Sequence, residues 1–170
     1  MNTLELRRVD VTYINPGDSA QMLQYAMTDF WVDGRSMAET LGIAEQRPWF
    51  GRTRFEANLE TIERFKLELM GQVVPSNQFE SERLVLFGCH CGADYCGVIS
   101  CRLEVSADTV RWLEIAEERD GFQTPSILEP LDGLLLEWHT LTFERAAYER
   151  TVLEFVRSLS ITSTQSRPRV

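Results

Sequence analysis

The feature that most limits how this chain can fold is the stretch GCHCGADYCGVISC at residues 88–101, which holds all four cysteines of the protein. Segments rich in aliphatic and β-branched residues, at 83–89 and 98–105, lie on either side of a glycine-containing turn. This pattern is typical of an antiparallel hairpin, and we expect its turn to be centred on Ala93-Asp94.

The hairpin predicts where the four thiols lie relative to one another. With this turn, Cys91 lies opposite Cys96, and Cys89 lies opposite Val98. Side chains alternate across a strand, so these three cysteines share one face near the turn, whereas Cys101 lies on the other face. A slip of one residue in the register would exchange the two faces.

The spacing of the cysteines supports a zinc site as one hypothesis. Zinc prefers four nitrogen or sulfur ligands in a tetrahedral site, often with ligand pairs two to four residues apart. The pattern Cys89-x-Cys91-Gly-x-x-x-Cys96-Gly offers three thiolates, and its glycines are typical of turns whose backbone amides point toward metal-bound sulfur. The usual C-x-x-C pair is missing, so a fourth ligand must come from elsewhere: His139, Asp94 or Cys101.

Two other interpretations of the cysteines stay open at this stage. A thiol redox centre would pair Cys89 with Cys91, or Cys91 with Cys96, and it requires a thiolate of lowered pKa. The acidic surroundings, including Asp94, oppose such a lowering of the pKa. Alternatively, the cysteines are small apolar residues that fill a tightly packed core.

The rest of the sequence predicts one α+β domain over residues 1–160, a mainly antiparallel sheet with about three helices packed on it. A polar, disordered tail is expected at 161–170. Alternating or apolar runs predict strands at 4–13, 22–31, 83–89, 98–105, 110–115 and 134–138. Helical spacing of apolar residues and capping signals predict helices at 36–41, 59–70 and 142–159.

Three local features refine this scheme. The apolar alternation over 4–6 is out of step with that over 9–13, which predicts a slip or bulge near Arg7-Arg8. The tetrapeptide Ser36-Met37-Ala38-Glu39 is a capping box and predicts the start of a short helix. Thr142 is the expected cap of the last helix.

Charge and hydropathy limit the partners and the compartment. The formal net charge of −9 repels phosphate backbones and anionic membranes, so nucleic acid is excluded and a basic protein is the easier partner. The N-terminus lacks the apolar core of a secretory signal, and the apolar runs are too short to cross a bilayer. We therefore expect a cytoplasmic protein whose cysteines are thiols or metal ligands.

A basic and aromatic island stands out in this acidic chain. Arg47, Trp49, Arg52 and Arg54 have the composition of a protein-binding hot spot or an anion pocket. The alternative is a surface loop whose aromatic residues pack inward while its arginines stay solvated. The acidic stretch Glu114–Asp120 is expected to be a solvated edge that a basic partner could meet.

The hairpin with its flanks resembles a group of small, uncharacterised bacterial proteins that share a G-C-x-C-G-x-x-x-C-G hairpin. The residues that carry the resemblance are Val85-Leu-Phe-Gly-Cys-His-Cys-Gly, then Cys96-Gly and Val110-x-Trp112. The resemblance implies a bacterial cytoplasmic origin and a shared fold, and it implies no activity.

The sequence contains no recognised catalytic constellation. The leading hypothesis is therefore a non-enzymatic binding or interaction module with an acidic surface. The alternatives are a small zinc-binding module or a thiol-based oxidoreductase, and both would use Cys89, Cys91 and Cys96.

Overall fold

Two antiparallel sheets organise the residues that the computed structural model describes, which are 1–14, 22–43, 50–128 and 139–165. The strands are β1 Leu4–Ile14, β2 Met22–Val32, β3 Arg35–Ser36, β4 Phe50–Arg52, β5 Leu84–Cys89, β6 Val98–Val105, β7 Thr109–Glu118, β8 Ser126–Ile127 and β9 Thr140–Glu144. The α-helices are α1 Met37–Thr40, α2 Leu59–Leu69 and α3 Arg145–Gln165.

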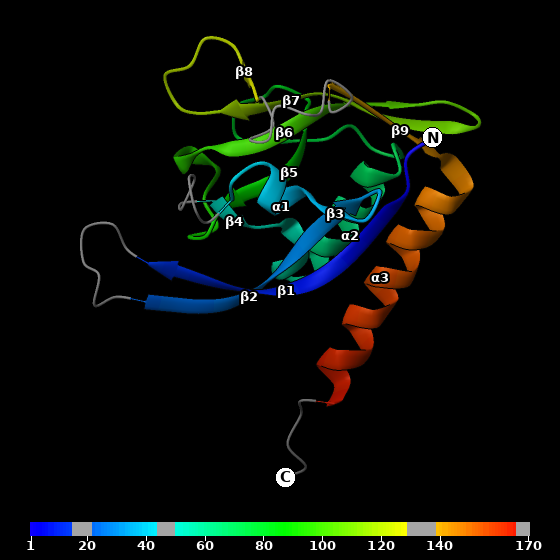
Figure 1. Ribbon diagram of the computed structural model, residues 1–170, viewed down its shortest axis with the longest axis horizontal. Helices are drawn as coiled ribbons and strands as arrows, with labels where there is room; N and C mark the ends of the chain where they lie inside the picture. Colours follow the sequence, from blue (N-terminus) through cyan, green and yellow to red (C-terminus); the bar gives the residue numbers. More distant parts are fainter. Residues whose placement is uncertain (15–21, 44–49, 129–138, 166–170) are drawn as a thin grey trace.

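The sheets are arranged as a small one and a large one. The small sheet has the order β1-β2-β3, and the large sheet has the order β4-β5-β6-β7-β8 with β9 paired to the other end of β7. Figure 1 shows the long β1–β2 ribbon on the opposite side of the molecule from β6 and β7, with α3 along one flank. This arrangement confirms the predicted α+β class, built mainly from antiparallel strands with three helices in the described part of the chain.

The first strand is regular, and the bulge predicted near Arg7-Arg8 is wrong. β1 pairs with β2 in one unbroken register over its whole length. The apolar set at 4–6 shares the face of Phe30, which packs in the main core, whereas the set at 9–11 points to the opposite face, toward α1. The apolar residues change face because each part of the strand packs on a different neighbour.

Capping residues set the ends of the first two helices as the sequence predicts. Ser36 Oγ accepts a hydrogen bond from the backbone N–H of Glu39 at 3.0 Å and donates one to the carboxylate of Asp29 at 2.6 Å. Asp29 also accepts from the N–H of Ala38 at 3.0 Å, so a buried carboxylate anchors the first turn of α1 to β2. Gly71 follows α2 with φ of +66°, a left-handed conformation that favours glycine and ends the helix.

Aromatic side chains join the two sheets in one core. The ring of Phe30, on β2, lies 5.6 Å from that of Phe87 on β5 and 5.4 Å from that of Trp112 on β7, in edge-to-face geometry. Trp112 Nε1 donates a hydrogen bond to the hydroxyl of Tyr148 on α3 at 3.2 Å. These contacts pack β5 and β7 against β2, and α3 against β7.

The last helix begins later than expected because a strand precedes it. Thr142 lies in β9, opposite Arg111 of β7, so its predicted role as the helix cap is wrong. The carboxylate of Glu144 caps the helix instead, by accepting from the backbone N–H groups of Ala146 and Ala147 at 3.1 and 2.7 Å.

The end of α3 also differs from the expected boundary. The helix continues to Gln165, past residue 160, where we expected the folded domain to end. Residues 166–170 and the strand predicted at 134–138 lie outside the described residues.

The core hydrogen bond between Trp112 and Tyr148 gives a stability prediction. The substitution Tyr148→Phe leaves the buried indole N–H without its acceptor, so the free energy of unfolding should fall by about 1–3 kcal/mol. Tyr95→Phe is the matched control, because Tyr95 is 68% exposed and the change there should stay within about 0.5 kcal/mol. Urea denaturation of the two variants measures both changes, and equal losses would contradict this account of the core.

Candidate metal centre

The connection between β5 and β6 is a loop and not the tight turn predicted from the sequence. The pairing of the two strands ends where Gly88 lies opposite Val98, one residue away from the predicted register. A register irregularity within β5 shifts the pairing, and a 3₁₀ turn at Asp94–Cys96 occupies part of the loop. The predicted position of Cys91 opposite Cys96 in a strand pair is therefore wrong.

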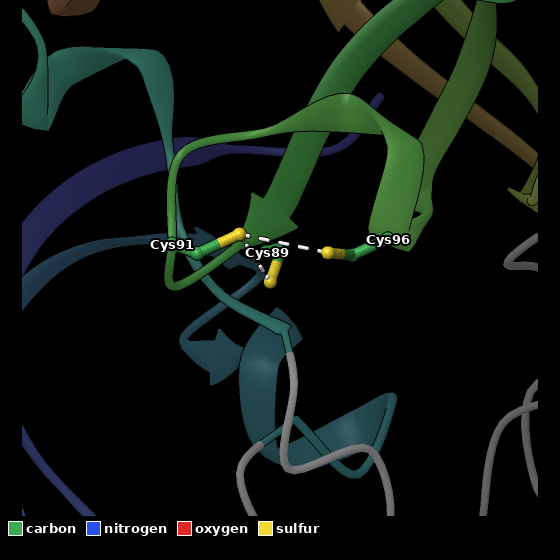
Figure 2. A group of neighbouring side chains, drawn as sticks. All are labelled: Cys89, Cys91 and Cys96. Atoms are coloured by element: carbon green, nitrogen blue, oxygen red, sulfur yellow. Dashed lines mark hydrogen bonds between the residues drawn. The ribbon is translucent and has the colours of Figure 1, made fainter.

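The loop nevertheless brings three sulfur atoms together, so the predicted clustering of these thiols is confirmed. Figure 2 shows Cys89 at the end of β5, with Cys91 and Cys96 directed toward the same point from the loop. The Sγ atom of Cys91 lies 3.1 Å from that of Cys89 and 3.5 Å from that of Cys96, and all three lie within 4.8 Å of one another. All three are free thiols, with Cys89 buried and the other two exposed.

The spacing of the sulfurs suits a tetrahedral metal ion. Metal–sulfur bonds of about 2.3 Å at tetrahedral angles place two sulfurs roughly 3.8 Å apart. The separations of 3.1 and 3.5 Å are close to this value, so small side-chain adjustments bring all three sulfurs within bonding distance of one ion. The three cysteines could therefore hold a metal ion.

The surroundings of the sulfurs change their pKa values in opposite directions. Burial raises the pKa of the Cys89 thiol to about 12, and the neighbouring sulfur of Cys91 adds to this rise. The hydrogen bond with Cys89 lowers the pKa of the Cys91 thiol, and the backbone N–H of Ala93 acts in the same direction. The expectation that the surroundings oppose a lowered thiol pKa is therefore wrong for Cys91.

Two glycines give the loop its shape. Gly92 has φ of +83° and donates its N–H to the carbonyl of Cys89 at 2.9 Å, which closes the turn around the sulfurs. Gly97 has φ of +117°, and a Cβ atom there would lie 3.1 Å from the carbonyl of Glu118 and 3.3 Å from the ring of Phe50. Glycine is required at this position because both the backbone conformation and the close packing exclude a side chain.

The sequence offers His139, Asp94 and Cys101 as candidates for the fourth metal ligand, and none of them lies with the three sulfurs. Among the residues with described positions, the group of close ligand atoms consists of the three cysteines. Cys101 is buried in the core, and His139 lies just before β9, outside this group. The carboxylate of Asp94 accepts from Arg54 at 3.4 Å.

A cavity of about 520 Å³ is lined in part by Cys89 and Cys91. β4 supplies one wall of this cavity because Phe50 pairs with Cys89. This pairing places Arg52 and Arg54 in the lining of the same cavity. The sequence identified both the basic island and the cysteines, but it gave no sign that the two would meet.

The described part of the basic island lines this cavity. Arg52 donates from one terminal guanidinium nitrogen to the carbonyl of Glu56 at 2.9 Å. Arg54 forms ion pairs with Glu68 at 3.5 Å and with Asp94 at 3.4 Å. The other two members of the predicted interaction surface lie outside the described residues: Arg47 and Trp49.

The acidic stretch at 114–120 is not the solvated edge that the sequence predicted. Glu117 and Glu118 are buried, and Ser100 Oγ donates a hydrogen bond to Glu118 at 2.5 Å. Glu114 has φ of +53° at a register irregularity between β6 and β7. This irregularity changes which side chains point inward along the strand.

Comparison of the chain with protein-family models, with curated proteins and with solved structures finds no match. Within the described ranges, no helix is long and apolar enough to cross a membrane.

The electrostatics of the loop predict which thiol reacts first in metal-free, reduced protein. We expect iodoacetamide to modify Cys91 faster than Cys89, because the Cys91 thiol has the lower pKa and is exposed. The rate of Cys91 modification should rise at lower pH than that of a cysteine in an unstructured peptide. Peptide mass spectrometry over a time course measures these rates.

Cys101 is the internal control for this experiment. Its thiol is buried in the core and burial raises its pKa, so it should react only after unfolding. Modification of Cys89 or Cys101 at the rate of Cys91 would contradict the described environment of the loop.

Proposed function

We propose that this protein binds one zinc ion through the thiolates of Cys89, Cys91 and Cys96. The observation that carries the proposal is the convergence of three free sulfurs within 4.8 Å at the end of a buried strand. Backbone N–H groups of Cys91 and Ala93 support it, because they face the sulfurs of Cys89 and Cys91 and favour their thiolate forms. Soft thiolate ligands in tetrahedral geometry favour zinc among the common divalent ions.

Zinc would have a structural effect at this place in the fold. It would join the end of β5 to the loop residues that precede β6, and thereby hold a segment that contains the conformationally demanding Gly92 and Gly97. The burial that raises the pKa of Cys89 disfavours a lone thiolate, and the charge of a bound ion offsets that cost.

The hypothesis of an acidic module that binds a basic protein stays a prediction based on the net charge of −9. The described arginines of the expected interaction surface contact Glu56, Glu68 and Asp94 within the molecule. We therefore place metal binding first. A thiol oxidoreductase is the other alternative, and the two exposed thiols of Cys91 and Cys96, 3.5 Å apart, are the pair it would use.

Metal analysis of cysteine variants tests the proposal. Wild-type protein purified without chelator should contain about one zinc per chain, and Cys96→Ala should lower zinc affinity by about 100-fold or more because one of three ligands is lost. Cys101→Ala is the matched control, since it removes the one cysteine outside the group and should keep the zinc. Zinc binding of wild-type strength in Cys96→Ala would refute the proposed ligand set.

Removal of the metal should destabilise the protein in a pH-dependent way. A ligand at about 100 times its dissociation constant stabilises the folded state by about 2.7 kcal/mol, so chelation should lower the melting temperature. Protons compete with zinc for thiolates, and the raised pKa of Cys89 strengthens this competition. The difference in melting temperature between the zinc-bound and chelated forms should therefore be large at about pH 8 and small at about pH 5.5. A difference that is equal at both pH values would contradict thiolate ligation.

A further inference from the structure

The three sulfurs leave the coordination of a zinc ion incomplete, and this raises the question of what completes it. Zinc takes four ligands in structural sites, whereas catalytic sites keep one position for water or another external ligand. Within the part of the chain that the structure describes, no fourth histidine, cysteine or carboxylate ligand atom lies within 4.8 Å of all three sulfurs.

The imidazole of His90 lies close to Cys89 but lines a different cavity. Its Nδ1 atom lies 3.9 Å from the sulfur of Cys89. His90 lines a second cavity together with Tyr25, Glu56 and also Arg52, and it does not line the cavity whose lining includes Cys89 and Cys91. The cavity beside Cys89 and Cys91 is therefore bounded by residues other than His90.

The cavity that Cys89 and Cys91 line has a volume of about 520 Å³, which is typical of small-molecule sites. Its lining includes Arg52, whose Nη1 atom lies 3.2 Å from the place where a Cβ atom on Gly92 would be. The cation is thus beside the residue that follows Cys91. Among the described residues, the guanidinium of Arg52 makes one hydrogen bond, from Nη2 to the carbonyl of Glu56. Its Nε and Nη1 atoms therefore keep N–H donors for a ligand.

The hydrogen-bond donors of Arg52 indicate what kind of ligand this arrangement accepts. A divalent ion with three thiolates carries a net charge of −1, and the guanidinium of Arg52 offsets it. Arg54 and Asp94 also line the cavity, and Arg54 forms ion pairs with both Asp94 and the buried Glu68. A carboxylate has two oxygens in one plane, so it can bind a metal ion with one oxygen and accept hydrogen bonds from a guanidinium with the other.

We propose that the fourth position of the metal takes the carboxylate of a small external molecule bound in this cavity, with one oxygen on the metal and the other on Arg52. This proposal rests on the zinc site proposed above and adds the class of its ligand. The site would then recognise small carboxylic acids, and the cavity would hold the remainder of the molecule.

Cobalt substitution of the full chain tests the metal site and the ligand separately. Near-ultraviolet charge-transfer bands from thiolate to Co²⁺ report the three cysteines, and the visible d–d bands report a change of the fourth ligand. Titration with acetate should change the d–d bands in a saturable manner, while chloride at the same ionic strength should not. Arg52→Gln should weaken acetate binding by about tenfold or more, because a charge-assisted hydrogen bond is lost.

Arg64→Gln is the matched control, because Arg64 is an exposed arginine of α2 that pairs with Glu68 and does not line the cavity. It should bind acetate as the wild type does. Absence of the charge-transfer bands would refute the metal site itself. Presence of those bands with no saturable response to acetate, or an unchanged affinity in Arg52→Gln, would overturn the carboxylate proposal alone. A change of the d–d bands in His90→Gln without acetate would show that His90 completes the site, and would also overturn it.

Discussion

The pairing of β5 with its neighbours β4 and β6 is the constraint on which the cysteine site depends. Cys89 is the last residue of β5, and its position is fixed because it lies opposite Phe50 of β4 and directly follows Gly88, which pairs with Val98 of β6. The chain must then return to β6 within a few residues, and the left-handed glycines of the loop allow this. Three sulfurs meet because one is held by the sheet and the other two lie in the short loop that leaves and re-enters it. The same pairing with β4 brings two arginines to the cavity beside them.

The sequence predicts most of the fold where the signal is local. The N-cap of α1 at Ser36, the end of α2 at Gly71 and the strands on either side of the cysteines follow from neighbouring residues. The errors arise where distant parts of the chain decide the outcome. β1 looks interrupted because its two parts pack on different neighbours, which no local alternation can reveal. The segment before α3 becomes a strand because β7 pairs with it, although the alternation of Thr140-Leu141-Thr142-Phe143 was a signal that could have been used.

The candidate site was predictable in part for the same reason. The clustering of Cys89, Cys91 and Cys96 follows from their closeness in sequence. It was predicted correctly although the predicted strand register was wrong by one residue. The cavity was not predictable, because the pairing of β4 with β5 joins residues far apart in the chain. The lowered pKa of Cys91 was missed for a related reason, since the formal charge of nearby residues says nothing about backbone N–H groups and a neighbouring thiol. The short-range contacts of Cys91 affect the pKa of its thiol more than the net charge of the protein does.

X-ray absorption at the zinc edge of the zinc-loaded protein tests the central claim most directly, because it counts the atoms bonded to the metal and distinguishes sulfur from lighter elements. Our account predicts three sulfurs at about 2.3 Å and one oxygen at about 2.0–2.2 Å. Four sulfurs would contradict it, because the fourth cysteine is buried in the core away from the other three. A shell of nitrogen and oxygen without sulfur would contradict it entirely, because the zinc would then be bound elsewhere on the protein.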